Sequence, residues 1–163
     1  LNNLAFLILG LLTSLLFPPY FFFPLGFLVF PFLCFLIEKN NSTINKIKIF
    51  KYSFFYSFGL LISFLFWLQN PFFVYNETKN LFFLFIIFII FLSLIFSTIF
   101  LFFINYNKLL NVVFTLPIIF IISEFIISIL LYGFPWITFS LIVADNDLFL
   151  ISFKYFGTLI TSY

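Results

Sequence analysis

The sequence predicts an all-α polytopic membrane protein, a bundle of about six transmembrane helices with the last one truncated. Hydrophobic residues make up 65% of its 163 residues and charged residues 7%, and the mean hydropathy is +1.31. A water-soluble domain of this size could not bury so much apolar surface. The apolar residues form continuous runs, which suit spanning helices of about 20 residues and do not fit the alternating strands of a β-barrel. Soluble enzymes, nucleic-acid binders and disordered linkers are therefore excluded.

Polar or proline-containing breaks separate the apolar runs. The predicted spans are residues 4–17, 21–37, 52–68, 81–104, 109–131 and 148–163. Pro18-Pro19 ends the first span because proline cannot continue a helix. The first two spans are short and interrupted by proline, so a re-entrant hairpin is an open alternative there. The first run lacks the basic start and the cleavage site of a signal peptide, and we expect it to remain as an anchor.

Lysine placement predicts the orientation. The loops after the second and fourth spans hold five lysines, whereas the loops after the first, third and fifth spans hold only Lys79. Because lysines concentrate in cytoplasmic loops, we expect a cytoplasmic N-terminus and outer turns after the odd spans. Lys154 falls in the sixth run, where its side chain would snorkel towards the outer surface. The five loop lysines are Lys39, Lys46, Lys48, Lys51 and Lys108.

Few residues are suited to catalysis or metal binding. The chain has no histidine and one cysteine, which excludes an intrachain disulfide, a Cys/His zinc site and a histidine-based triad. Cys34 has no base beside it and is expected to be a small buried hydrophobe. The five carboxylates are scattered and predict no metal site, and we interpret the 34 phenylalanines as apolar filler. Serines and Gly59 at four-residue spacing in the third and fourth spans indicate close helix packing.

Glu124 stands out because it lies inside the fifth span, where an unpaired carboxylate costs several kcal/mol. One interpretation is a polar anchor that fixes the outer loop or faces a lipid-access cavity. The other is a protonated carboxyl hydrogen-bonded to Ser123, to Ser128 or to a neighbouring helix. The residues alone leave both interpretations open.

Gly133-Phe134-Pro135-Trp136 follows the fifth span directly. Glycine can adopt the left-handed conformation that ends a helix, proline prevents the helix from resuming, and tryptophan favours the headgroup layer. On physical grounds alone this is an ordinary helix exit with an interfacial anchor. Trp67 at the outer end of the third span receives the same interpretation, as do three tyrosines, Tyr20, Tyr75 and Tyr132.

Three groups of residues, taken with the order of the spans, carry a family resemblance. They are Leu16-Phe17-Pro18-Pro19-Tyr20 with Pro24-Leu25; Phe58-Gly59 with Trp67; and Pro117, Glu124-Phe125, Gly133-Phe134-Pro135-Trp136 and Asp145. With these motifs the chain resembles, over essentially its whole length, the N-terminal membrane domain of the apolipoprotein N-acyltransferase family. The resemblance assigns substrate-binding or loop-organising roles to Glu124, Gly133, Phe134, Pro135, Trp136, Trp67, Pro19 and Tyr20.

The resemblance implies a multi-pass protein of the bacterial inner membrane, with no cofactor, no metal and no nucleic-acid partner. Its full-length enzyme would transfer an acyl chain from a phospholipid donor to the S-diacylglyceryl cysteine of a lipoprotein acceptor, through a thioester. The Glu-Lys-Cys triad would lie in a nitrilase-like domain beyond residue 163, so we expect this fragment to be inactive alone. A small multi-span transporter subunit and a membrane assembly factor are the alternatives.

The sequence departs from the family pattern at three positions. Ile127 replaces the arginine expected three residues after Glu124, so the expected ion pair inside the helix is missing. Ser140 stands where glycine is usual, and Val143 stands where a polar residue is common.

Overall fold

The computed structural model describes residues 2–41, 45–103, 109–132 and 138–144, together with 151, 154, 155 and 157. Within these ranges the regular structure is helical and no strand is present, which confirms the predicted all-α membrane bundle. The predicted sixth span, apart from those four residues, lies outside the described part of the chain.

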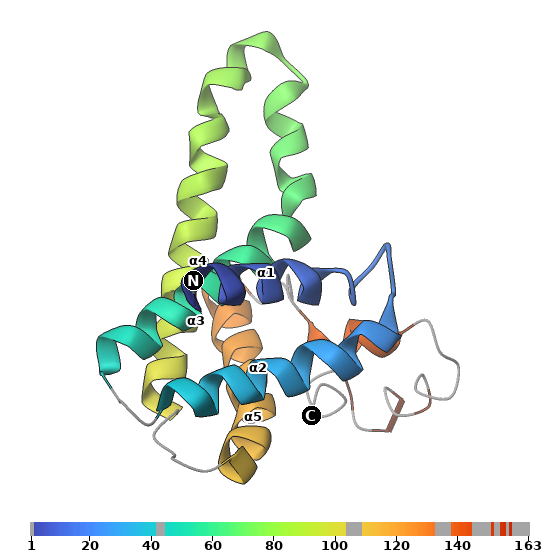
Figure 1. The fold of residues 1–163 in the computed structure, drawn as a ribbon. Helices are drawn as coiled ribbons and strands as arrows, with labels where there is room; N and C mark the ends of the chain where they lie inside the picture. Colours follow the sequence, from blue (N-terminus) through green and yellow to red (C-terminus); the bar gives the residue numbers. More distant parts are fainter. Residues whose placement is uncertain are drawn as a thin grey trace.

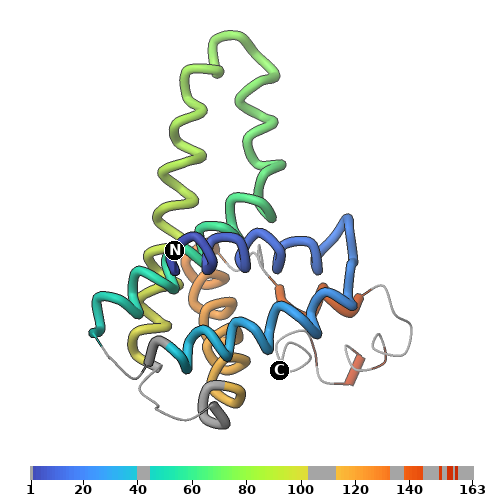
Figure 2. The backbone as a smooth tube through the Cα atoms, viewed as in Figure 1, coloured from blue at the N-terminus to red at the C-terminus, as the bar shows by residue number. Residues whose placement is uncertain are grey.

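The described residues form five α-helices and four 3-10 helices (Figure 1). The α-helices are α1 (Asn2–Ser14), α2 (Gly26–Asn41), α3 (Lys46–Phe64), α4 (Phe82–Phe103) and α5 (Leu109–Leu130). The 3-10 helices are η1 (Phe23–Leu25), η2 (Phe66–Phe73), η3 (Asn76–Leu81) and η4 (Phe139–Val143). In this view α1 and α2 run horizontally, whereas α4 and α5 run vertically (Figures 1 and 2). The segment formed by η2, η3 and the first part of α4 projects beyond α1, α2 and α5.

Three helical segments of the described chain are long and apolar enough to cross a membrane. They are Lys46–Phe64, Asn76–Phe102 and Val113–Leu130. The α-helix α4 has 22 residues and is about 33 Å long, which matches a hydrocarbon core of about 30 Å. The first two helices are shorter, since α1 has 13 residues and α2 has 16 residues with Pro31 inside it.

The helix α3 begins six residues before the predicted span at 52–68. Asn45 caps it, because the side-chain oxygen of Asn45 accepts a hydrogen bond from the backbone N–H of Ile47 at 3.0 Å. The α-helix then ends at Phe64, and the chain continues as η2. Hydropathy locates the apolar part of this helix, and the capping residue marks where the helix itself starts.

Two glycines bring α1 and α3 into backbone contact. A Cβ atom on Gly10 would collide with the carbonyl oxygen of Tyr56, and one on Gly59 would collide with the carbonyl oxygen of Leu7. Only glycine permits helices to approach this closely, and α1 packs more extensively against α3 than against any other element. The pair α1 and α3 is therefore the tightest contact in the bundle.

Serines occupy the contact between α3 and α4. The side chains of Ser57, Ser93 and Ser97 are fully buried, and the hydroxyl of Ser57 lies 3.3 Å from the carbonyl oxygen of Ser93. The hydroxyl of Ser97 donates to the same carbonyl at 2.6 Å. These small side chains allow close packing and keep their hydroxyl groups hydrogen-bonded inside an apolar bundle.

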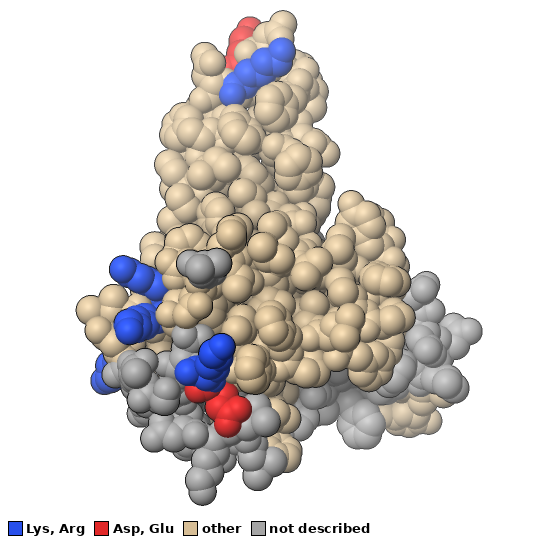
Figure 3. All heavy atoms as spheres, in the orientation of Figure 1, with Lys and Arg blue, Asp and Glu red and all other residues tan. Residues whose placement is uncertain are grey.

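Charged side chains gather at two places on the face shown in Figure 3. One basic and one acidic side chain lie at the tip of the η2–η3 hairpin, which carries Glu77 and Lys79. The other group lies where α2 ends and α3 begins, and the surface between the two groups is uncharged. An uncharged surface between charged ends suits a protein embedded in a bilayer.

Candidate functional site

Glu124 lies in the last two turns of α5, and its side chain is only 3% exposed. One of its carboxylate oxygens, Oε2, accepts a hydrogen bond from the backbone N–H of Phe139 at 3.1 Å. Phe139 is the first residue of η4, fifteen residues further along the chain. The contact therefore joins the interior of α5 to the segment that follows the helix.

The helix α5 ends two residues before a left-handed residue. The backbone N–H of Leu131 donates to the carbonyl of Ile127 at 3.0 Å, and that of Tyr132 donates to Ile129 at 3.3 Å. Tyr132 then has a φ of 58°, in the region that favours glycine. The sequence pointed to Gly133 for this conformation, but the described helix is already closed at Tyr132, and Gly133 lies outside the described residues.

Aromatic rings surround the Glu124–Phe139 contact. The ring of Phe139 stacks on that of Phe120, with centroids 4.4 Å apart and planes 18° from parallel. The ring of Phe17 meets Phe139 edge-on at 5.5 Å and packs against Phe64 at 4.6 Å. Phe17 follows α1 and Phe64 ends α3, so these rings join the C-terminal ends of two helices to η4. We call Phe17, Phe64, Phe120 and Phe139 the aromatic cluster.

The turn after α1 places Phe17 in this cluster. Successive backbone N–H groups of Leu15, Leu16 and Phe17 donate to carbonyls three residues earlier, which tightens the end of the helix. The chain then reverses through the cis Pro18-Pro19 bond, and the backbone N–H of Phe22 donates back to Leu15 at 3.0 Å. Phe17 is fully buried as a result.

The residues predicted to act at this site differ in exposure where the structure describes them. Glu124 is buried, whereas Tyr20 is 67% exposed and Trp67 is 52% exposed. Pro19 is exposed on the same turn as Tyr20. Gly133, Phe134, Pro135 and Trp136 lie outside the described residues.

The contacts around Glu124 can hold one end of the bundle in place. The described residues offer little for covalent chemistry. They contain no group of three or more His, Cys, Asp or Glu side chains that could hold a metal ion. Cys34 is buried within α2. What the described geometry provides is a fixed end of the bundle, built from α1, α3, α5 and η4.

A comparison with protein families gives one match over most of the chain. The model described as "Apolipoprotein N-acyltransferase N-terminal domain" matches residues 9–163. The chain belongs to the apolipoprotein N-acyltransferase N-terminal domain family. A search of curated proteins returns no match.

The described geometry shows how this family member accommodates a departure from the motif. Ile127, at the position where the resemblance assigns an arginine, is 2% exposed and belongs to the apolar core. One polar partner of Glu124 among the described residues is a backbone group of η4, the N–H of Phe139. The same 3-10 helix contains Ser140 and Val143, the other two departures from the family pattern.

Sequence reasoning missed the aromatic cluster as a unit. With 34 phenylalanines in the chain, composition does not distinguish a packed ring from one that faces lipid. The available signal was position, because Phe17 directly precedes the Pro18-Pro19 turn of the first family motif. Phe139 had no comparable signal, since its role depends on a backbone N–H.

Proposed function

We propose that this chain is the membrane domain of an apolipoprotein N-acyltransferase. That enzyme would transfer an acyl chain from a phospholipid to the amino group of an S-diacylglyceryl cysteine at the N-terminus of a lipoprotein. The observation that carries the proposal is the family match over residues 9–163. The all-α membrane fold supports it, because both substrates are lipids held in the bilayer.

The chemistry divides into two balanced steps. A cysteine thiolate attacks the ester carbonyl of the phospholipid, forming a thioester and releasing a lysophospholipid. The amino group of the lipoprotein cysteine then attacks the thioester, forming an amide and returning the thiol. By resemblance, a nitrilase-like domain supplies the Glu-Lys-Cys triad, and residues 1–163 supply the membrane part without activity of their own.

In this proposal Glu124 organises the outer end of the bundle. Its hydrogen bond to Phe139 and the aromatic cluster hold α1, α3, α5 and η4 together. The turns that carry Tyr20 and Trp67 would then present aromatic side chains to the headgroup layer, beneath the catalytic domain. The segment 133–136 would complete this surface.

The proposed location is the bacterial inner membrane, with the N-terminus in the cytoplasm. Four lysines, Lys39, Lys46, Lys48 and Lys51, lie on the end of α2 and the start of α3, in the predicted cytoplasmic loop and its flanks. Their excess over the single lysine of the η2–η3 hairpin supports this orientation.

The proposal can be tested with a chimera that joins residues 1–163 to the remainder of an active family member. The assay supplies a phospholipid with a labelled acyl chain and a peptide that begins with S-diacylglyceryl cysteine. We expect amide-linked label in the peptide, and none with residues 1–163 alone or with the chimera whose catalytic cysteine is replaced by alanine. A correctly inserted chimera that gives no labelled amide would contradict the proposal.

A further inference from the structure

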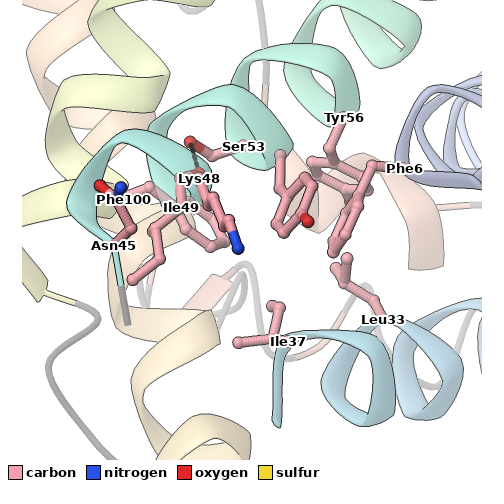
Figure 4. A pocket seen from close by; sticks show the side chains of 10 residues that line it. Phe6, Leu33, Ile37, Asn45, Lys48, Ile49, Ser53, Tyr56 and Phe100 are labelled. Carbon is pink, nitrogen blue, oxygen red and sulfur yellow. Dashed lines mark hydrogen bonds between the residues drawn. The ribbon is translucent and has the colours of Figure 1, made fainter. Parts of the chain in front are cut away.

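A small cavity lies at the start of α3, where four helices meet. Its apolar wall includes Phe6 of α1, Ile37 of α2, Tyr56 of α3 and Phe100 of α4 (Figure 4). Its enclosed volume is about 20 Å³. A single water molecule needs roughly 10–15 Å³, so this space admits a small group and not an acyl chain.

Two polar side chains also line the cavity, Lys48 and Asn45. Figure 4 shows the side chain of Lys48 extending from α3 towards the space beside Ile37. The side-chain oxygen of Asn45 accepts the capping hydrogen bond from Ile47, and the remaining amide N–H₂ group can only donate. An ammonium and an amide N–H₂ group together favour an anionic oxygen-rich ligand.

The surface around the cavity has a strong positive charge. Lys39, Lys46 and Lys51 are exposed on the same end of α2 and α3, where Glu38 is the one acidic side chain among the residues described there. Four lysines against one carboxylate give this described surface a net charge of +3. The ligand should therefore carry a net negative charge, because a headgroup with its own ammonium would be repelled.

Because the cavity lies in a membrane protein, we expect the anion to be the headgroup of a lipid. Phe35 of α2 and Ile47 of α3 are 50% and 62% exposed, and the ammonium of Lys39 lies 5.9 Å from the centre of the Phe35 ring. A phospholipid can place its phosphate at Lys48 while its acyl chains remain outside, along the two helices. Basic pockets between helices at the cytoplasmic end of a bundle are suited to such headgroups.

We propose that the exposed rim of this cavity, where Lys48 and Asn45 lie, binds the phosphate of an anionic phospholipid from the leaflet that it faces. Lys48 and Asn45 would donate to the phosphate oxygens, and the surrounding lysines would raise the local concentration of anionic lipid. The site lies at the opposite end of α3 from Phe64 of the aromatic cluster. Its occupancy does not depend on acyl transfer, so it can fail or hold independently of the proposed function.

The test uses the purified chain in a neutral detergent and counts bound lipids by native mass spectrometry during a titration. The probes are phosphatidylglycerol, phosphatidylcholine and glycerol phosphate as the free headgroup. We expect phosphatidylglycerol to bind at least tenfold more tightly than phosphatidylcholine, without competition from equimolar glycerol phosphate. Lys48→Gln should weaken phosphatidylglycerol binding about fivefold, because it removes a donor at the cavity together with one positive charge.

Lys46→Gln is the matched control, because Lys46 is also exposed on the first turn of α3 but does not line the cavity. We expect it to weaken binding less than twofold, with circular dichroism showing the parental helix content for both variants. Equal losses for the two variants would show diffuse attraction and overturn the site. Equal binding of the two lipids, or displacement by glycerol phosphate, would overturn the assignment to an anionic lipid.

Discussion

The carboxylate of Glu124 and the backbone N–H of Phe139 form a 3.1 Å hydrogen bond between the interior of α5 and the start of η4. Both residues are buried, with exposures of 3% and 5%. The bond satisfies a carboxylate and a main-chain donor that would each be costly to leave unpaired in an apolar interior. It also holds the ring of Phe139 against Phe17 and Phe120.

Two substitutions of Glu124 distinguish the loss of its hydrogen-bond acceptor from the loss of its side-chain shape. Glu124→Leu removes the acceptor of the Phe139 N–H and should lower the free energy of unfolding by about 1–3 kcal/mol. Glu124→Gln keeps a carbonyl acceptor for the Phe139 N–H and should lose less, because this hydrogen bond can still form. Thermal unfolding in detergent measures both, and limited proteolysis between α5 and η4 reports the local effect. Parental stability and protease resistance in Glu124→Leu would show that the bond does not hold η4.

The edge-on pair of Phe17 and Phe139 should contribute a measurable coupling between α1 and η4. We expect a double-mutant cycle with Phe17→Leu and Phe139→Leu to give a coupling free energy of about 0.5–1.5 kcal/mol. Leucine retains most of the apolar volume, so the cycle isolates the ring contact. Strict additivity of the two single substitutions would show that the two segments are independent.

The contact between α1 and α3 should not tolerate a methyl group at its centre. Gly10→Ala would place a Cβ against the carbonyl oxygen of Tyr56 and 2.8 Å from the backbone nitrogen of Leu60. Because backbone atoms cannot move aside, we expect a loss of about 1–3 kcal/mol in the free energy of unfolding.

Gly26→Ala is the matched control for this substitution. Gly26 has a φ of −58°, and its nearest neighbour to a new Cβ is a Leu16 side-chain carbon at 3.4 Å. We expect alanine there to be neutral or to stabilise the protein by up to about 1 kcal/mol. The two variants can be compared in one thermal-unfolding series, and equal effects would contradict the close approach of α1 and α3.

Tyr132 follows the end of α5 with a left-handed backbone. We therefore expect two substitutions at this exposed position to have opposite effects. Tyr132→Gly relieves a conformation that costs an L-residue about 1–2 kcal/mol, and it should raise the unfolding temperature. Tyr132→Val adds a β-branched side chain at a φ of 58° and should lower it. If glycine is the less stable of the two, the exit of α5 does not have this backbone conformation.

The apolar runs located two helices closely. Residues 81–104 and 109–131 contain α4 and α5, whose bounds are Phe82–Phe103 and Leu109–Leu130, because polar turns interrupt hydropathy at both ends. The η2 and η3 helices lie partly in a segment interpreted as a polar break, since short 3-10 helices tolerate polar residues and Pro71. The early start of α3 depended on the Asn45 cap, which a hydropathy pattern does not report.

The candidate site was predictable in part for a similar reason. A carboxyl inside an apolar helix is conspicuous, so Glu124 was found from its energetic cost alone. The Phe139 N–H that donates to it is a main-chain group, which has no signature in the sequence. The convergence of Phe17, Phe64 and Phe139 depends on three segments far apart in the chain, and long-range packing of identical residue types leaves no periodic pattern.

The most direct test of the proposed membrane domain is to measure which side of the membrane the turn after α1 and the start of α3 each face. In a Cys34→Ala background, single cysteines at Tyr20 and Lys46 mark the turn after α1 and the start of α3. A membrane-impermeant thiol reagent applied to intact cells should label the cysteine at position 20 at once. The cysteine at position 46 should be labelled only after the inner membrane is permeabilised. Labelling of position 46 and protection of position 20 in intact cells would contradict a site that faces its lipid substrates on the outer side.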